Sequence, residues 1–199
     1  MILEERVKQA QAWEEKGKPS TWSEPRSWSE QSKFPWAEGL ISSLPGSVTI
    51  LDVGCYTGYF LREFCKRHPV SFRGIGVDIQ RDLMNKLNGL SRQAGWPITF
   101  YHQIPSSLQV DVVTSFDTLE HVWNDITLLG NMHGALKPGG LMLIHLPQEE
   151  RFDETNEEHL RVYTRKDLES WLPRYDKTIT EGTDEHGRPT WRVALKKPL

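Results

Sequence analysis

The residues best suited to chemistry are two carboxylates and two glycines that follow short apolar runs. Residues 48–53 form an apolar, β-branched run that contains Asp52, and Gly54 and Gly58 come directly after it. Apolar residues then recur at helical spacing. A second apolar run ends at Asp78, twenty residues past Gly58, where a carboxylate can accept hydrogen bonds from both hydroxyls of a ribose. This arrangement predicts the strand, glycine loop and helix that open a nucleotide-binding α/β sheet.

The loop argues against a pyrophosphate ligand. Tyr56 stands where the dinucleotide fingerprint has its second glycine, which lets the backbone approach a diphosphate. No Gly-x-x-x-x-Gly-Lys-Ser/Thr sequence occurs, so a P-loop is not supported. Asp52 would repel phosphate but suits a cationic ammonium, and because an unpaired buried carboxylate is costly, we expect it to bind loop amides, such an ammonium, or both. Asp78 has a second interpretation, as the N-cap of a helix predicted over residues 80–94, but its spacing favours the ribose.

The pattern Asp-x-Gly-x-x-x-Gly, followed by an acid at the end of the next strand, resembles the class I S-adenosylmethionine-dependent methyltransferases. Three later segments occur in the order of that family: residues 110–117 resemble its fourth strand, residues 118–122 its Leu-Glu-His element, and residues 136–144 its next turn and fifth strand. The resemblance spans roughly residues 46–172. It implies S-adenosylmethionine as cofactor and S-adenosylhomocysteine as product. The cofactor contacts that it implies are Asp52, Gly54, Cys55, Tyr56, Gly58, Tyr59, Asp78, Ile79, Gln103, Ile104, Asp117, Thr118 and Leu119.

The adenine pocket departs from the pattern of that family. Members of that family often have an acidic residue after the third strand, which accepts a hydrogen bond from the adenine amino group. This chain has His102-Gln103-Ile104 there instead. We expect Gln103 or the backbone to take the place of the acid, and Ile104 to stack on the ring.

Glu120 and His121 are the predicted catalytic residues, because they follow the strand that would end beside the sulfonium of the cofactor. An imidazole can accept a proton from an acceptor hydroxyl near neutral pH. The same residues also suit a helix start, with Asp117 or Thr118 as cap and Glu120 in the first turn. Since the donor sulfonium is already activated, alignment and exclusion of water are enough for many methyl transfers.

A metal-dependent version of the site is the alternative to a metal-free one. Asp117-x-x-Glu120-His121 resembles the Glu-x-x-Glu-His site of small-RNA 3′-terminal 2′-O-methyltransferases and of some ubiquinone-pathway O-methyltransferases, and His159 stands where the RNA enzymes complete their site. Here the first ligand is the shorter Asp, and the Glu-His element is also widespread in metal-free relatives. We therefore expect no metal. His145 and Pro147, at the end of the fifth strand, are expected to line the acceptor pocket.

The alternation of strand and helix patterns predicts a Rossmann-like three-layer α/β/α sandwich. The resemblance implies a seven-stranded, mostly parallel sheet whose antiparallel last strand lies beside the fifth, and two alternating stretches near the C-terminus fit a closing hairpin. The expected helices span residues 36–44, 58–67, 80–94, 120–136 and 164–172. The expected strands span residues 48–53, 72–77, 98–102, 110–116 and 140–146, with the hairpin at 178–181 and 190–195.

The chain is expected to form one domain with an N-terminal arm. Residues 46–199 are the predicted cofactor-binding core, and residues 1–45 a helical arm that holds four of the eight tryptophans. The arm either packs on the sheet through its aromatic side chains or acts as a lid, with Arg26 or Lys33 reaching the methionine carboxylate.

Composition points to a cytoplasmic protein. The 199 residues are 37% hydrophobic with a mean hydropathy of −0.55, and no apolar run approaches the ~20 residues of a membrane span. The charged N-terminus lacks a signal-peptide pattern, and two cysteines suggest reduced thiols. A net charge of −3 gives no general attraction to nucleic acid.

These features favour methyl transfer from S-adenosylmethionine to an oxygen or nitrogen atom of a small molecule, by a monomer or homodimer with no membrane partner. Residues 149–158 hold six acids and form either a solvated loop or a surface that attracts a cationic acceptor. The alternatives are RNA 2′-O or protein methylation and a non-catalytic module that binds S-adenosylmethionine. Dehydrogenase activity is a distant fourth interpretation.

Overall fold

The structure is a computed structural model that describes residues 27–29, 31–69, 72–148 and 159–199. Most of the predicted N-terminal arm, including Arg26, and the whole acidic segment 149–158 lie outside the described residues. The elements in chain order are α2 (Lys33–Ser42), β1 (Val48–Val53), α3 (Tyr59–Arg67), β2 (Phe72–Val77), α4 (Arg81–Ala94), β3 (Ile98–Tyr101), β4 (Val110–Phe116), the 3₁₀ turn η1 (Leu119–His121), α5 (Asp125–Ala135), β5 (Leu136–Pro147), α6 (Arg165–Ser170), β6 (Asp176–Thr183) and β7 (Pro189–Lys196).

The sheet has seven strands in the order β3-β2-β1-β4-β5-β7-β6. The first five strands are parallel, whereas β7 runs antiparallel to both β5 and β6. The expected Rossmann-like topology, with an antiparallel last strand beside the fifth, is therefore confirmed. Since parallel strands share one carboxyl edge, the loops after β1, β2, β3, β4 and β5 meet there.

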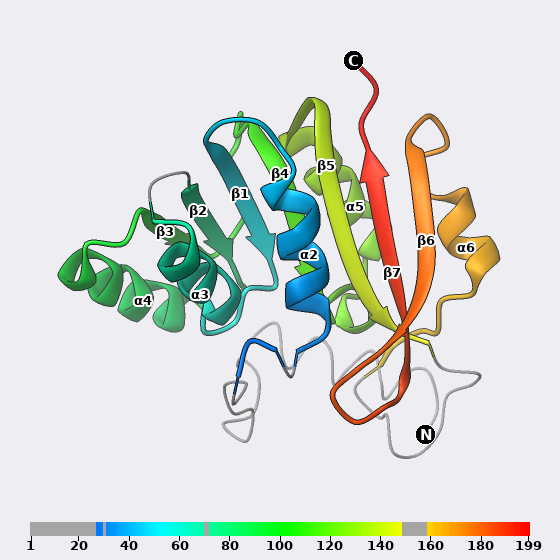
Figure 1. Ribbon diagram of the computed structural model, residues 1–199, viewed down its shortest axis with the longest axis horizontal. Coiled ribbons are helices and arrows are strands. Elements are labelled where there is room, and N and C mark those ends of the chain that lie inside the picture. The colour runs from blue at the N-terminus through cyan, green and yellow to red at the C-terminus, as the bar shows by residue number, and fades with distance from the viewer. Residues whose placement is uncertain (1–26, 30, 70–71, 149–158) are drawn as a thin grey trace.

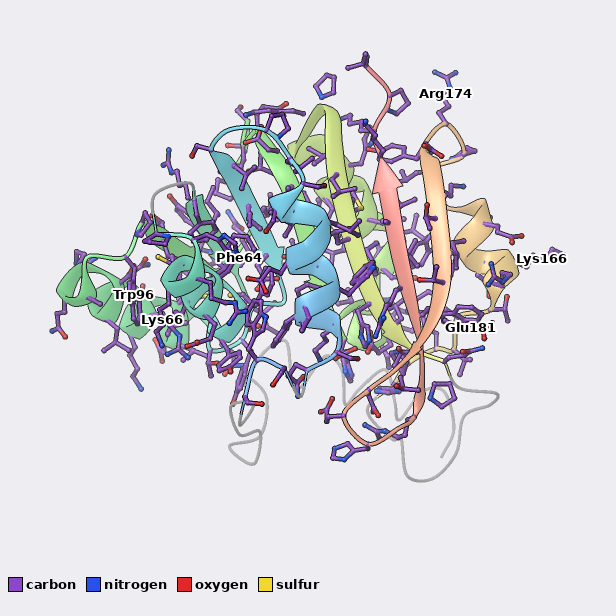
Figure 2. All side chains as sticks on the ribbon, viewed as in Figure 1. Phe64, Lys66, Trp96, Lys166, Arg174 and Glu181 are labelled. Atoms are coloured by element: carbon purple, nitrogen blue, oxygen red, sulfur yellow. The ribbon has the colours of Figure 1, made fainter. Side chains whose placement is uncertain are left out.

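Two layers of helices cover the sheet (Figure 1). Helices α2, α3 and α4 pack on one face through a cluster of buried side chains that includes Phe64 of α3, labelled between α3 and β1 in Figure 2. Helices α5 and α6 pack on the other face. The strands contribute alternate residues to the two clusters, as a sheet buried on both faces requires: Leu143 faces α2 and Ile144 faces α5.

The helix expected over residues 120–136 is divided in the structure. Leu119–His121 form a short 3₁₀ turn, Val122 is extended, and α5 starts only at Asp125. Asn124 sets this start, because its side chain accepts a hydrogen bond from the Thr127 amide at 3.2 Å. The other expected elements are present with ends shifted by a few residues, the largest shift being the start of β5 at Leu136.

The described part of the arm packs on the core. Trp28 is 8% exposed and stacks on Phe60 of α3 at 5.5 Å between ring centroids. Its indole donates a hydrogen bond to Glu38 in α2 at 3.0 Å. Aromatic anchoring of residues 27–42 is thus observed. Among the described residues no helix has the length and apolar character needed to span a membrane.

Candidate active site

The glycine loop after β1 turns sharply at the carboxyl edge of the sheet. Gly54 and Gly58 have φ of 77° and 69°, in the left-handed region that favours glycine. A Cβ on Gly54 would lie 2.1 Å from the Thr118 hydroxyl, and a Cβ on Gly58 would lie 2.5 Å from the Phe100 ring. The amide of Gly54 donates to the carbonyl of Val77 at 2.8 Å, which joins the loop to the end of β2. Both glycines are therefore required by the backbone and by close packing.

Asp78 connects this loop with the start of α4. Its Oδ2 accepts from the Tyr56 amide at 3.0 Å and its Oδ1 from the Gln80 amide at 3.1 Å. Gln80, and not Asp78, occupies the N-cap position of α4. Asp78 supports the start of the helix indirectly, because it accepts the hydrogen bond from the amide of this N-cap residue. A carboxylate offers about four acceptor sites, so two hydrogen bonds leave Asp78 able to accept more.

Asp52 lies beneath the loop and is 3% exposed. Its Oδ1 accepts from the Thr114 hydroxyl of β4 at 2.7 Å, a partner that the sequence did not indicate. Burial raises the pKa of Asp52 to about 7; the Thr114 hydrogen bond opposes this shift, the Asp78 charge adds to it and the Lys33 charge opposes it. A carboxyl group of this kind gains a proton near neutral pH unless a cation lies beside it.

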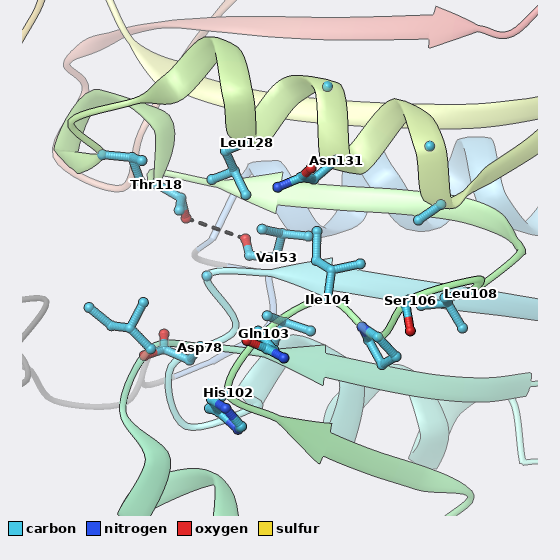
Figure 3. Close-up of a pocket in the computed structure, with 18 of the residues that line it drawn as sticks. Val53, Asp78, His102, Gln103, Ile104, Ser106, Leu108, Thr118, Leu128 and Asn131 are labelled. Atoms are coloured by element: carbon cyan, nitrogen blue, oxygen red, sulfur yellow. Dashed lines mark hydrogen bonds between the residues drawn. The ribbon is translucent and has the colours of Figure 1, made fainter.

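A cavity of about 710 Å³, here called the main cavity, opens at the same edge. It runs between the loop after β3 and α5 (Figure 3). The predicted site residues that line it are Gly54, Asp78, Ile79, Gln103, Ile104, Thr118 and His121. Those that do not are Asp52, Cys55, Tyr56, Gly58, Tyr59, Asp117, Leu119 and Glu120. The main cavity also includes residues that the sequence did not indicate, namely Pro105 to Leu108 and Leu128, Gly130, Asn131 and Gly134 of α5.

Several of the predicted contacts face the protein interior instead. Cys55 is buried with its sulfur 3.9 Å from that of Met84, and Tyr59 packs against Phe34 at 5.8 Å between ring centroids. Leu119 is 1% exposed and belongs to the core on the α5 side. Sequence spacing did not determine the side-chain directions of these residues.

Asp117 forms a polar cluster with Lys33 and His145. Its Oδ1 lies 2.6 Å from His145 Nδ1, and its Oδ2 accepts from the ammonium of Lys33 in α2. The backbone supports the pair, since Asp117 has φ of 47° and its amide donates to the His145 carbonyl at 3.0 Å. Although burial opposes ionisation of Asp117, the charges of Lys33 and His145 lower its pKa overall.

His145 is more enclosed than expected. It is 2% exposed and does not line the main cavity. Within the described part of the chain its Nε2 is buried and has no hydrogen-bond partner. Lys33, proposed from the sequence as part of a lid, reaches Asp117.

A second cluster joins Glu120, His121 and His159. Glu120 is 1% exposed and His121 is 9% exposed, with His121 Nε2 4.0 Å from Glu120 Oε1. His159 lies against His121 at 4.8 Å between ring centroids, and the amide of Leu160 donates to the Glu120 carbonyl at 2.7 Å. One ligand atom from each of the three residues lies within 4.8 Å of the others. The fourth residue of the metal pattern, Asp117, is directed to Lys33 and His145.

Comparison with known proteins assigns the family. The profile of the methyltransferase domain family matches residues 10–181. A trans-aconitate 2-methyltransferase from Azoarcus is 24% identical over 127 residues, which cover 63% of this chain and 49% of the relative. A ubiquinone biosynthesis O-methyltransferase from Ruegeria pomeroyi is 27% identical over 99 residues, covering 47% of this chain and 39% of the relative. The chain thus spans about half or less of the length of the curated relatives it matches.

The fold is shared with solved methyltransferase structures. One is the 1,6-didemethyltoxoflavin N1-methyltransferase of Burkholderia thailandensis, solved with 1,6-didemethyltoxoflavin and S-adenosylhomocysteine. It superposes with a TM-score of 0.68 at 15% identity, covering 98% of this chain and 87% of that one. Since the family profile covers most of the sequence, the chain belongs to the methyltransferase domain family.

Proposed function

We propose that this protein transfers the methyl group of S-adenosylmethionine to an oxygen or nitrogen atom of a small molecule and releases S-adenosylhomocysteine. The observation that carries the proposal is the main cavity, which joins the glycine loop, the Asp78 carboxylate and His121 at the carboxyl edge of a methyltransferase-type sheet. Two relatives, named for trans-aconitate and for ubiquinone biosynthesis, support a small-molecule acceptor.

The residues present fit this cofactor. Gly54 lines the main cavity, and its lack of a side chain lets Thr118, another lining residue, pack against the glycine loop. Asp78 has acceptor capacity for the ribose hydroxyls, and Ile104 offers an apolar surface to the adenine (Figure 3). Asp52, buried below the loop, supplies the negative charge that a cationic amino group would favour.

When bound, the cofactor supplies an activated methyl group on a positively charged sulfur. This methyl group would pass to a lone pair of the acceptor, and the electron pair of the broken carbon–sulfur bond would stay on sulfur. The protein aligns the two reactants and excludes water. His121, at the wall of the main cavity, is the group we assign to take a proton from an acceptor hydroxyl.

The test is calorimetric titration with S-adenosylhomocysteine, followed by a methyl-transfer assay with a panel of small acceptors. We expect binding by the wild type, a loss of at least tenfold in Asp78→Ala, and no change in Asp82→Ala, a control on the first turn of α4 outside the main cavity. His121→Gln should retain binding and lose turnover. A folded protein that binds NADH but not S-adenosylhomocysteine would refute the proposal, and cofactor binding without turnover on any acceptor would favour a non-catalytic module.

A metal-assisted form of the same transfer is the second candidate, because Glu120, His121 and His159 offer a carboxylate and two imidazoles within 4.8 Å of one another. In a tetrahedral site with metal–ligand bonds of about 2.1 Å the ligand atoms lie about 3.4 Å apart, so these three side chains would have to move closer together by up to about 1.4 Å to share a metal. The test is turnover before and after chelation, with and without added Mg²⁺, Mn²⁺ or Zn²⁺. Unchanged turnover excludes this form, whereas loss that a metal restores in the wild type but not in His159→Ala establishes it.

A further inference from the structure

The direction in which His121 points depends on the short turn η1. Within this turn the amide of His121 donates to the Thr118 carbonyl at 3.0 Å. The amide of the next residue, Val122, donates to the Leu119 carbonyl at 3.3 Å. Hydrogen bonds of a 3₁₀ turn have poor geometry, and the chain is extended at Val122 before α5 starts at Asp125. A turn this short, followed directly by extended chain, needs support from other parts of the molecule to hold one orientation.

Residues 160–163, here called the bracing segment, lie along η1 although they come between β5 and α6 in the chain. The amide of Leu160 donates to the Glu120 carbonyl at 2.7 Å. The hydroxyl of Tyr163 donates to the Leu119 carbonyl at 3.2 Å. The backbone directly before His121 is therefore bonded to a segment from a distant part of the chain.

Arg161 of the bracing segment binds the chain after His121, at the break between η1 and α5. Its Nη2 donates to the carbonyl of Trp123 at 2.8 Å, and its Nη1 forms an ion pair with Asp125, the first residue of α5. The side chains of Arg161 and Asp125 are 23% and 14% exposed, so water weakens this pair less than a pair on the open surface. A guanidinium is planar and holds its N–H groups in a fixed fork. Its two bonds therefore fix the path of the chain that leads from His121 into α5.

The bracing segment is itself fixed to the core at Tyr163, which is buried. The carbonyl of Tyr163 accepts from the Trp191 indole of β7 at 2.9 Å, and its ring packs edge-to-face on Trp171 at 5.1 Å between ring centroids. Its hydroxyl also donates to Asp125 at 2.8 Å. Burial and the Asp125 charge raise the pKa of Tyr163, so the hydroxyl keeps its proton and remains a donor. The bracing segment thus links η1 to the core formed by β7 and the end of α6.

His121 and Val122 line the main cavity, whereas none of residues 160–163 does. We propose that Arg161 is a positioning residue for methyl transfer, which holds η1 in the orientation that directs His121 to the main cavity. This inference rests on the proposed function, since it takes His121 as the group that receives the proton of the acceptor. A displacement of 1 Å at a reacting group can lower a rate about a hundredfold. Loss of Arg161 should therefore lower turnover and leave Asp78 and the glycine loop able to bind the cofactor.

The first experiment observes His121 by NMR and needs only S-adenosylhomocysteine as ligand. The imidazole C–H signal of His121 is identified by its absence in His121→Gln. Arg161→Met keeps the aliphatic stem and removes both bonds, and Arg161→Lys keeps the charge but not the fork. Arg188→Met is the control, because it breaks another arginine–aspartate pair, with Asp184, in the loop between β6 and β7. A circular dichroism melt checks folding, and Arg161→Lys alone decides the test if Arg161→Met does not fold.

We expect the ligand to shift the His121 signal in the wild type and in Arg188→Met. In Arg161→Met this shift should fall by at least half, with an intermediate change in Arg161→Lys. The dissociation constant of S-adenosylhomocysteine should change by less than threefold in all three variants. A wild-type His121 signal in the Arg161 variants, with the ligand bound normally, would overturn this inference and leave the proposed function standing. Absence of binding by a folded wild type would overturn both.

The second experiment measures turnover with the acceptor that the panel of small acceptors identifies. Arg161→Met should lower kcat at least tenfold and change the KM of the acceptor by less than threefold, and Arg161→Lys should recover part of the loss. A positioning residue acts through the group that it positions, so adding Arg161→Met to His121→Gln should lower kcat by less than a further twofold. An equal loss in both backgrounds would overturn the inference, since Arg161 would then act through another part of the protein.

Discussion

The affinity of this protein for S-adenosylhomocysteine should depend on pH through one buried carboxyl group. Burial raises the pKa of Asp52 to about 7, so about half of the unliganded protein carries a neutral Asp52 at that pH. The cationic amino group of the ligand favours the ionised form. The dissociation constant should therefore rise in inverse proportion to the ionised fraction, about tenfold between pH 8 and pH 6 and about tenfold more by pH 5.

Asp52→Asn is the matched perturbation, because the amide keeps an oxygen acceptor for the Thr114 hydroxyl and cannot ionise. Calorimetry from pH 5 to pH 8.5 should give a flat profile for this variant. Its affinity should equal that of the wild type at pH 5 and lie about a hundredfold below it at pH 8. Parallel profiles for the two proteins would refute the reasoning, since the pH dependence would then belong to another group.

Stability offers a second readout that needs no ligand. An ordinary Asp has a pKa of about 3.9 in the unfolded chain, and Asp52 has a pKa of about 7 in the folded protein. The folded state therefore binds a proton at Asp52 more tightly, and the contribution of this group to stability should be fully present below about pH 4, fall as the pH rises to about 7, and stay level above that. A shift of about three pKa units corresponds to about 4 kcal/mol. Urea unfolding should show this fall in the wild type and not in Asp52→Asn, and a fall of equal size in both would contradict the assignment.

Three further changes test other parts of the site. In a urea titration, Gly54→Ala should lower the free energy of unfolding by about 3 kcal/mol, because φ of 77° is strained for alanine and its Cβ would lie 2.1 Å from the Thr118 side chain. Gly46→Ala is the control, with φ of 76° and open space around its Cβ, and should lower this free energy by only about 1 kcal/mol. Asp117→Asn should cost about 1–3 kcal/mol at pH 7. Since the pKa of Asp117 is lowered by its cationic neighbours despite burial, its carboxylate stabilises the fold above about pH 4, and the difference between the two proteins should shrink below that pH. Tyr163→Phe removes a hydrogen bond of 2.8 Å to Asp125 and should lower the urea midpoint by the equivalent of about 1–2 kcal/mol.

The strands and the glycine loop could be predicted from the sequence because their signals are local. Residues 48–53 and 110–116 are apolar, β-branched runs, and each forms a strand of the predicted length. The left-handed φ at Gly54 and Gly58 follows from the same short stretch. These elements fix the carboxyl edge of the sheet, and with it the place of the site.

Features that depend on contacts between distant parts of the chain could not be predicted from the sequence. Lys33, Asp117 and His145 come from α2, the end of β4 and β5, and no spacing rule relates three such positions. The inward directions of Cys55 and Tyr59 are set by packing partners on α4 and α2. Residues 102–109 form turns and irregular chain without a periodic pattern, so their place in the wall of the main cavity could not be anticipated either.

Directly after β4, two consecutive residues face different parts of the site. Thr118 faces the main cavity and its hydroxyl donates to the carbonyl of Phe116 at 2.9 Å. Its neighbour Asp117 turns to Lys33 and His145. The left-handed backbone at Asp117 produces this division, because it directs consecutive side chains to opposite sides of the turn. A β-branched residue at position 117 would disfavour that conformation. Aspartate tolerates left-handed φ and can also bind both Lys33 and His145. The separation of the cofactor side of the site from the polar cluster therefore depends on an aspartate at this position.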